Sequence, residues 1–183
     1  MRAKGFGRAI FSVGANDIVL NAPPIRRRYP TTILYFDGLC EPVNPGGVAT
    51  YGFVVYVGKA KVKEGCGLVG AGMLGDDVSN NVAEYTALIR GMEYALSNCP
   101  TEHLLVRGDS LLVVNQMLGK YAVKAQRMLP LNKQAVDLKN RLPSVEFEWV
   151  PRERNEEADA LSRVAFSQFL EEHRSSFERY YHR

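Results

Sequence analysis

The stretch Thr32-Ile33-Leu34-Tyr35-Phe36-Asp37-Gly38 decides the fold of this chain. The residues from Thr32 to Phe36 are apolar on both faces, as in a central strand of a sheet. The run stops at Asp37, so we expect this carboxylate at the end of the strand, followed by a turn-rich segment. Asp-Gly is also a common turn signal, and a pure turn role for Asp37 is the alternative.

The segments after this strand predict an antiparallel meander and then a crossover. Tyr51 to Val57 and Lys61 to Val69 flank a tight turn at 58–60, which indicates two further antiparallel strands. Apolar residues at helical spacing predict a helix over about 81–97, before a fourth strand over 104–108. A helical crossover is normally right-handed and makes its strands parallel, so the ends of the first and fourth strands should coincide. Asp37 and Asp109 then meet at one edge of the sheet.

The rest of the pattern completes an α/β fold. Helices are expected over 110–118, from Pro130 to Pro143 and from about 155 to 172, with an alternating strand over 145–149. We assign residues 1–30 to an N-terminal extension and linker with a candidate hairpin over 9–20. The main domain covers residues 31–172, and residues 173–183 form a basic, aromatic tail.

Composition limits the class of protein. The 183 residues are 46% hydrophobic and 23% charged, which suits one domain with a short extension. The sequence has no apolar stretch near the roughly 20 residues of a bilayer span, so no membrane is expected. Three widely spaced cysteines favour a reducing, cytoplasmic setting, and a basic start with Arg2, Lys4 and Arg8 leaves organellar targeting open. The net charge of +3 is compatible with a polyanionic partner.

Four acids at the ends of predicted elements suggest a metal centre. Each has a structural alternative: Glu84 has the spacing of a capping box with Asn81, Asp109 suits a helix N-cap, and Asp159 suits a solvated helix face. One hypothesis covers Asp37 and these three together, namely a carboxylate cluster that holds Mg²⁺. Two ions could hydrolyse a phosphodiester without a protein nucleophile, and no histidine stands in an evident triad.

The same residues carry a family resemblance. Four motifs in order are similar to those of type 1 ribonuclease H: 35–38 with 44–47, 80–88, 108–110 and 155–161. The resemblance implies a five-stranded mixed sheet with three antiparallel and two parallel strands, flanked by helices. It also implies hydrolysis of the RNA strand of RNA–DNA hybrids with two Mg²⁺ or Mn²⁺ ions, giving 5′-phosphate and 3′-hydroxyl ends. Asp37 would bridge both ions, Asp159 would help hold the ion that activates water, and Glu84 and Asp109 would hold the other.

Substrate contacts follow from the resemblance. Contacts along the RNA strand are expected at Gly38, Cys40, Asn44 and Gly46, and contacts in the minor groove at Asn80 and Asn81. The loop before Asp159 lacks the family's frequent His. Its Arg152 and Arg154 are candidate phosphate ligands, and a solvated charged loop is the alternative. The basic protrusion of some bacterial relatives is also missing. Basic contacts could come from Arg26 to Arg28 or, with aromatic contacts, from the tail Arg174 to Arg183; the tail could instead continue the last helix and pack on the body.

The expected partner is an RNA–DNA hybrid, with no small-molecule cofactor. We expect a monomer, and a dimer formed through the N-terminal extension is the alternative. A nucleic-acid-binding module that no longer cleaves and another nuclease of the same superfold are the competing functions.

Overall fold

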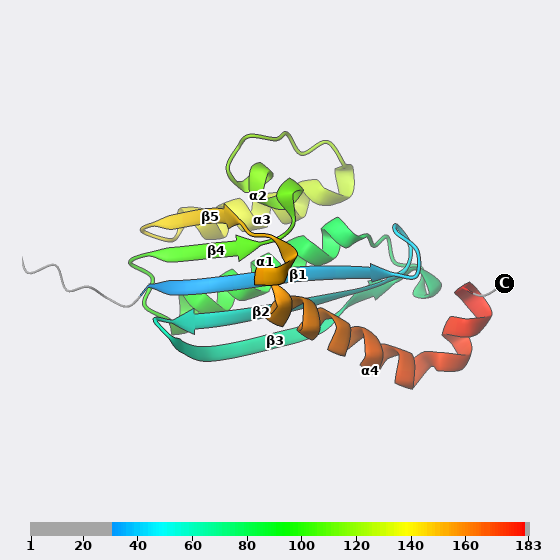
Figure 1. Cartoon of the computed structure of the whole chain (residues 1–183). Helices are drawn as coiled ribbons and strands as arrows, with labels where there is room; N and C mark the ends of the chain where they lie inside the picture. The colour runs from blue at the N-terminus through cyan, green and yellow to red at the C-terminus, as the bar shows by residue number, and fades with distance from the viewer. Residues whose placement is uncertain (1–30, 182–183) are drawn as a thin grey trace, which may run out of the picture.

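The structure is a computed structural model that describes residues 31–181. It consists of one twisted sheet with helices on both faces (Figure 1). The hairpin predicted within residues 1–30, and the organellar targeting left open for them, concern residues outside the described part of the chain. Within the described part of the chain, no helix is long and apolar enough to cross a membrane.

The sheet has five strands in the order β3-β2-β1-β4-β5. The strands are β1 Thr32–Glu41, β2 Val48–Val57, β3 Ala60–Ala71, β4 Leu104–Gly108 and β5 Val145–Trp149. β1 pairs antiparallel with β2, and β2 with β3, while β4 pairs parallel with β1 and with β5. The predicted fold class is therefore confirmed, including the parallel pairing of the first and fourth strands.

β1 is longer than the sequence predicts. It continues past Asp37 to Glu41, so the expectation that the strand ends at Asp37, or turns there, is wrong. The parallel neighbour β4 ends where Gly108 pairs with Phe36, but β2 continues to pair with β1 as far as Glu41. Since β2 supplies partners to the backbone beyond Phe36, the strand persists without β4. Asp37 thus lies inside β1 at the point where β4 stops.

Helices cover the sheet on both faces. The helices are α1 Asn80–Asn98, α2 Leu111–Met117, α3 Leu129–Asn140 and α4 Glu156–Tyr181, with short 3₁₀ turns η1 Gly72–Leu74, η2 Gln126–Met128 and η3 Arg152–Arg154. α1 packs on β1 and β2 and contacts α3 beside it, whereas α4 crosses β1, β2 and β3 on the opposite face (Figure 1). The main core lies between the sheet and α1 to α3 and includes Leu34, Phe36, Leu88, Met92 and Val106.

Two helix starts differ from the capping alternatives. The N-cap of α1 is Ser79, whose Oγ accepts a hydrogen bond from Val82 N at 3.4 Å, so the capping box of Asn81 and Glu84 is wrong. Ser110, not Asp109, occupies the N-cap position of α2. Neither acid is therefore needed to satisfy a helix terminus.

The C-terminal residues continue α4 instead of leaving the body. The helix runs to Tyr181 and bends at His173, where φ is −124° and ψ is 17°. Beyond the bend, Phe177 is buried in a separate apolar cluster with Val48 and Ala71. The packed alternative for the tail is confirmed as far as residue 181, and the domain boundary predicted at 172/173 falls at the bend.

Candidate active site

Close packing of α1 against β1 brings Glu84 to the level of Asp37. A Cβ atom on Gly38 would lie 2.2 Å from the backbone nitrogen of Glu84, closer than any real side chain allows. Glycine at position 38 therefore permits the start of α1 to lie directly against β1. Because Asp37 precedes Gly38 and Glu84 faces it, the two carboxylates come together from elements far apart in the sequence.

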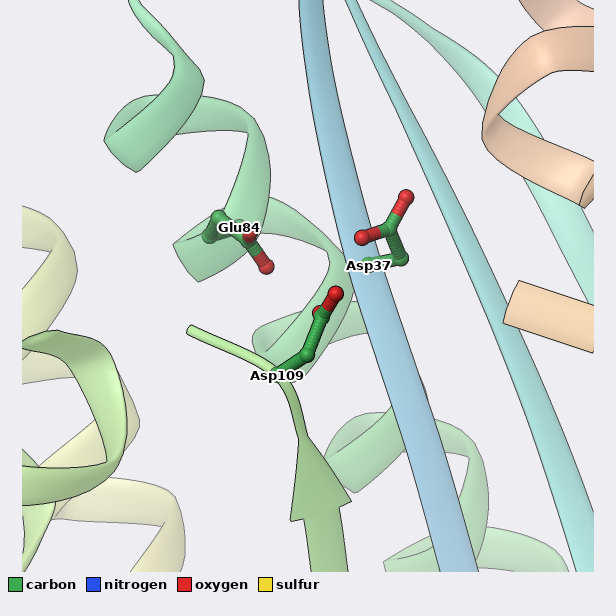
Figure 2. A group of neighbouring side chains, drawn as sticks. All are labelled: Asp37, Glu84 and Asp109. Atoms are coloured by element: carbon green, nitrogen blue, oxygen red, sulfur yellow. The ribbon is translucent and has the colours of Figure 1, made fainter. Parts of the chain in front are cut away.

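Asp109 completes a group of three acids. It follows the last residue of β4, beside the middle of β1, as parallel pairing requires. Carboxylate oxygens of Asp37, Glu84 and Asp109 all lie within 4.8 Å of one another. Figure 2 shows the three side chains directed toward a common space from β1, α1 and the end of β4. We call these residues the acid trio.

Burial makes the charged forms of the trio costly. Asp37 is 5% exposed and Glu84 is 4% exposed. Burial, with smaller contributions from Asp109 and Asp159, raises the pKa of Asp37 to about 7, although a hydrogen bond from Ser162 opposes the rise. Burial, followed by the charges of Asp37 and Asp109, also raises the pKa of Glu84 well above its ordinary value. A cation in this space would relieve both effects.

One oxygen of Glu84 marks where a cation would bind. Oε1 accepts a hydrogen bond from Asn80 Nδ2 at 3.4 Å, whereas the buried Oε2 has no hydrogen-bond partner among the described residues. Buried polar atoms are normally satisfied, so an unpaired carboxylate oxygen between two further acids fits a site that a cation would complete. The donor set consists of oxygens alone, which suits Mg²⁺ or Mn²⁺.

Two residues of the last helical segment orient the trio, and the sequence analysis did not assign them a role. Ser162 Oγ donates to Asp37 Oδ2 at 2.8 Å, and Asn155 Nδ2 donates to Asp109 Oδ1 at 2.9 Å. α4 can lie this close to β2 because residue 52, the partner of Asp37 in β2, is a glycine. A Cβ atom at this position would lie 2.3 Å from Ala158 O. The spacing of Ser162, three residues after Asp159 on one helix face, was the available signal.

Asp159 lies near the trio but does not join it. It lies in the first turn of α4, where Arg152 Nη2 and Arg163 Nε donate to its two oxygens, the latter at 3.0 Å. Burial raises the pKa of Asp159, but these hydrogen bonds outweigh it and hold the pKa below its ordinary value. Arg163 also lies 3.8 Å from Glu41 at the end of β1. The fourth acid is thus paired with cations of the protein itself.

All four acids line one surface hollow of about 310 Å³, together with Gly38, Asn80, Arg152 and Arg163. Of the predicted phosphate ligands, Arg152 therefore lies at the acids. Arg154 instead lines a separate hollow of about 460 Å³ between β1, β2 and the start of α4, beside Tyr35 and Tyr56. The larger hollow contains none of the four acids, so we place the chemistry in the smaller one.

Of the residues predicted to contact substrate, Gly38 and Asn80 line the acid hollow. Asn44 Oδ1 accepts a hydrogen bond from Asn80 N at 2.9 Å, which joins the turn between β1 and β2 to the start of α1. Gly46 has φ of 94° in that turn, and Asn81 is half-buried in the first turn of α1. The side chain of Cys40 is buried, so only its backbone could follow a substrate strand.

Sheet order and buried acids together define an α/β protein of the ribonuclease H-like class, and comparison with known proteins agrees. A family model described as "Reverse transcriptase-like" matches residues 48–165. The "Bifunctional protein Rv2228c" of Mycobacterium tuberculosis is 39% identical over 127 residues, 67% of this chain and 32% of the relative. The "Ribonuclease HI" of Halobacterium salinarum is 34% identical over 134 residues, 72% of this chain and 62% of the relative.

Solved structures match over most of their length. The N-terminal RNase H domain of rv2228c has a TM-score of 0.68 and 35% identity, covering 76% of this chain and 95% of that one. RNase H1 of Halobacterium salinarum has a TM-score of 0.67 and 32% identity, covering 75% and 98%. LC11-RNase H1 in complex with an RNA/DNA hybrid has a TM-score of 0.67 and 33% identity, covering 76% and 99%.

The chain belongs to the type 1 ribonuclease H family. It spans about a third of the length of the mycobacterial relatives that it matches.

Proposed function

We propose that this protein is a divalent-metal-dependent endoribonuclease that hydrolyses the RNA strand of RNA–DNA hybrids, giving 5′-phosphate and 3′-hydroxyl ends. The observation that carries the proposal is the acid trio, in which three carboxylates within 4.8 Å of one another include a buried oxygen without a partner. Such a site is costly to keep empty and suited to a hard cation. Membership of the type 1 ribonuclease H family supports the hydrolytic chemistry and this substrate class.

Four carboxylates would hold two Mg²⁺ or Mn²⁺ ions. Asp37, Glu84 and Asp109 would hold one, and Asp37 with Asp159 would hold the other. When bound, such a pair of ions activates the attacking water and stabilises the leaving oxygen of a phosphodiester. The oxygen-only donor set fits these ions, and no nucleophilic side chain is required.

The protein's own groups orient these acids. Ser162 Oγ lies 2.8 Å from Asp37 Oδ2 and 2.8 Å from the backbone oxygen of Asp159, and it orients the Asp37 carboxyl group. Asn155 fixes Asp109 through Oδ1. Arg152 and Arg163 hold Asp159 in the absence of substrate. A phosphate group of the substrate would compete for the same guanidinium groups, since both anions offer oxygens in a geometry that arginine binds well.

The substrate surface extends from the acids toward the turn between β1 and β2. Asn44 and Gly46 would follow the RNA strand, while Asn80 and Asn81 would approach the minor groove, where 2′-hydroxyls distinguish RNA from DNA. The likeness to an RNase H1 solved with an RNA/DNA hybrid supports this substrate class.

Cleavage of a labelled hybrid in Mg²⁺ tests the proposal. We expect Asp37→Asn to lower the cleavage rate by about 10²- to 10³-fold, the usual effect of removing one electrostatic stabiliser of a transition state. Asp137→Asn is the matched control, because Asp137 is exposed on α3 and pairs with Lys133 away from the site. Undiminished, metal-dependent cleavage by the Asp37 variant would refute the assignment.

The same assay separates the competing functions. Wild-type protein that binds the hybrid but leaves it intact would be a binding module. Faster cleavage of duplex DNA or duplex RNA than of hybrid would indicate another nuclease of this fold.

A further inference from the structure

We propose that Tyr181, at the end of α4, is a positioning residue for the RNA strand, because its hydroxyl group holds the turn that would contact that strand. The turn consists of residues 42–47 between β1 and β2, and we call it the RNA turn. The proposal rests on the proposed function. It makes the C-terminal segment beyond the bend in α4 part of the substrate site.

Other segments of the same chain hold the backbone of the RNA turn. Gly46 N donates to Val78 O at 3.0 Å, and Gly47 O accepts from Gly72 N at 2.9 Å. Asn44 is joined to Asn80 N through its side chain. None of these bonds involves the backbone oxygen of Gly46. Tyr181 Oη donates a hydrogen bond to that oxygen at 2.9 Å. The turn thus depends on one distant side chain, 135 residues away in the sequence.

The same hydroxyl group connects the RNA turn to η1. Tyr181 Oη accepts a hydrogen bond from Met73 N at 3.2 Å while it donates to Gly46. A Cβ atom on Gly72 would lie 2.0 Å from Gly46 O, so the turn and η1 are in direct backbone contact at this point. One phenol group therefore bridges two backbone segments that already touch.

Apolar packing of the last turns of α4 places Tyr181 beside the RNA turn. After the bend at His173, the last turns of α4 return toward the end of the sheet where β1 and β2 are joined (Figure 1). Phe177 is buried there against Val48 and Ala71, and its ring centroid lies 4.9 Å from that of Tyr181. The apolar contacts hold the end of α4, and the hydroxyl group of Tyr181 forms the hydrogen bonds to the turn and to η1.

Because the ring of Tyr181 packs on the helix and its hydroxyl group binds the turn, a substitution can separate a positioning role from a purely structural one. A phenylalanine at position 181 keeps the ring packing and loses only the two hydrogen bonds. The acid trio rests on β1, α1 and β4 and has no contact with the end of α4, so the chemical step should not change. Binding of the RNA strand should weaken, because Gly46 O loses its hydrogen bond and the turn is held less firmly.

Tyr181→Phe in the full chain tests the proposal, with Tyr180→Phe as the matched control. Tyr180 is the adjacent tyrosine and is 53% exposed. We expect Tyr181→Phe to raise KM for the hybrid by about 3- to 10-fold, the usual net effect of one or two hydrogen bonds, with kcat within about twofold of wild type. Amide hydrogen exchange at Met73 and at Gly46 should become faster, while exchange in the sheet stays as in wild type.

Each other outcome overturns the proposal. An unchanged KM would show that the hydroxyl group does not serve substrate binding. A fall in kcat alone would place its effect at the metal centre, and uniformly faster exchange with a lower melting temperature would make it a stability contact. Wild-type protein without hybrid cleavage would refute the proposed function separately. The exchange measurement requires no activity, and it still decides whether the hydroxyl group holds the turn.

Discussion

The acid trio and Asp159 line the same hollow, and they differ in the groups that hydrogen-bond to their carboxylates. The trio of Asp37, Glu84 and Asp109 is held by neutral donors, Ser162, Asn80 and Asn155, and retains a buried oxygen without a partner among the described residues. Asp159 is instead paired with two arginines. The trio is therefore arranged for a cation that the protein does not supply, whereas Asp159 already has its cations.

This difference suggests an order of binding. A buried anionic group without a counterion gains most from a metal ion, and an anion in two ion pairs gains least, because those pairs must be given up. We expect the first ion to occupy the trio. The second would require Asp159 to leave its arginines, which the phosphates of the substrate can promote by binding them.

The largest expected effect is on the stability of the metal-free protein. Since burial raises the pKa of Asp37 to about 7 from 3.8, its contribution is fully present below pH 3.8 and is lost as the pH rises through about 7. The free energy of unfolding in EDTA should fall by about 2 to 3 kcal/mol more in wild type than in Asp37→Asn between pH 5 and 8. Urea denaturation at the two pH values measures this.

The pH window isolates the trio from Asp159. The pKa of Asp159 lies below its ordinary value of 3.8, so its contribution to stability is lost only as the pH falls below that range. Added Mg²⁺ should remove the difference between wild type and the Asp37 variant at pH 8. An identical pH dependence in both proteins would contradict the assigned burial cost.

A smaller effect is expected on metal affinity. Glu84→Gln should weaken binding of the first Mn²⁺ ion by about 10-fold or more, because it removes a carboxylate from the trio. Asp159→Asn should leave that first affinity within about twofold, although it lowers cleavage. Calorimetric titration of the two variants without substrate makes the comparison. Equal losses in both would place Asp159 in the first site.

The smallest effect concerns the arginines. Arg163→Gln should lower the Mg²⁺ concentration for half-maximal cleavage by about two- to threefold, since it removes one competitor for Asp159. The effect is limited because Arg163 is 46% exposed. Arg90→Gln breaks an exposed ion pair on α1 and is the control. A higher requirement for Mg²⁺ in the Arg163 variant would show that Arg163 assists the second ion.

The sequence by itself predicted the pairing of the first four strands and the meeting of Asp37 with Asp109, although not the full length of β1. Apolar runs and short turns predicted the meander, and the helical crossover predicted the parallel pairing that sets Asp109 beside Asp37. These are local patterns combined with a rule of chain handedness, so they require no knowledge of distant side chains. The resemblance of the ordered motifs to type 1 ribonuclease H then predicted that Glu84 and Asp159 join the same site, and all four acids line one hollow.

Only the tertiary structure decided how that site is held. β1 continues past Asp37 because β2 supplies its partners, and Ser79 rather than Asn81 caps α1. Asp159 lies between Arg152 and Arg163, and Tyr181 reaches Gly46 across the molecule after the bend at His173. Each of these depends on contacts between segments distant in sequence or on the choice among competing local partners. Periodicity and spacing record which residues share a face, but not which distant group will meet them.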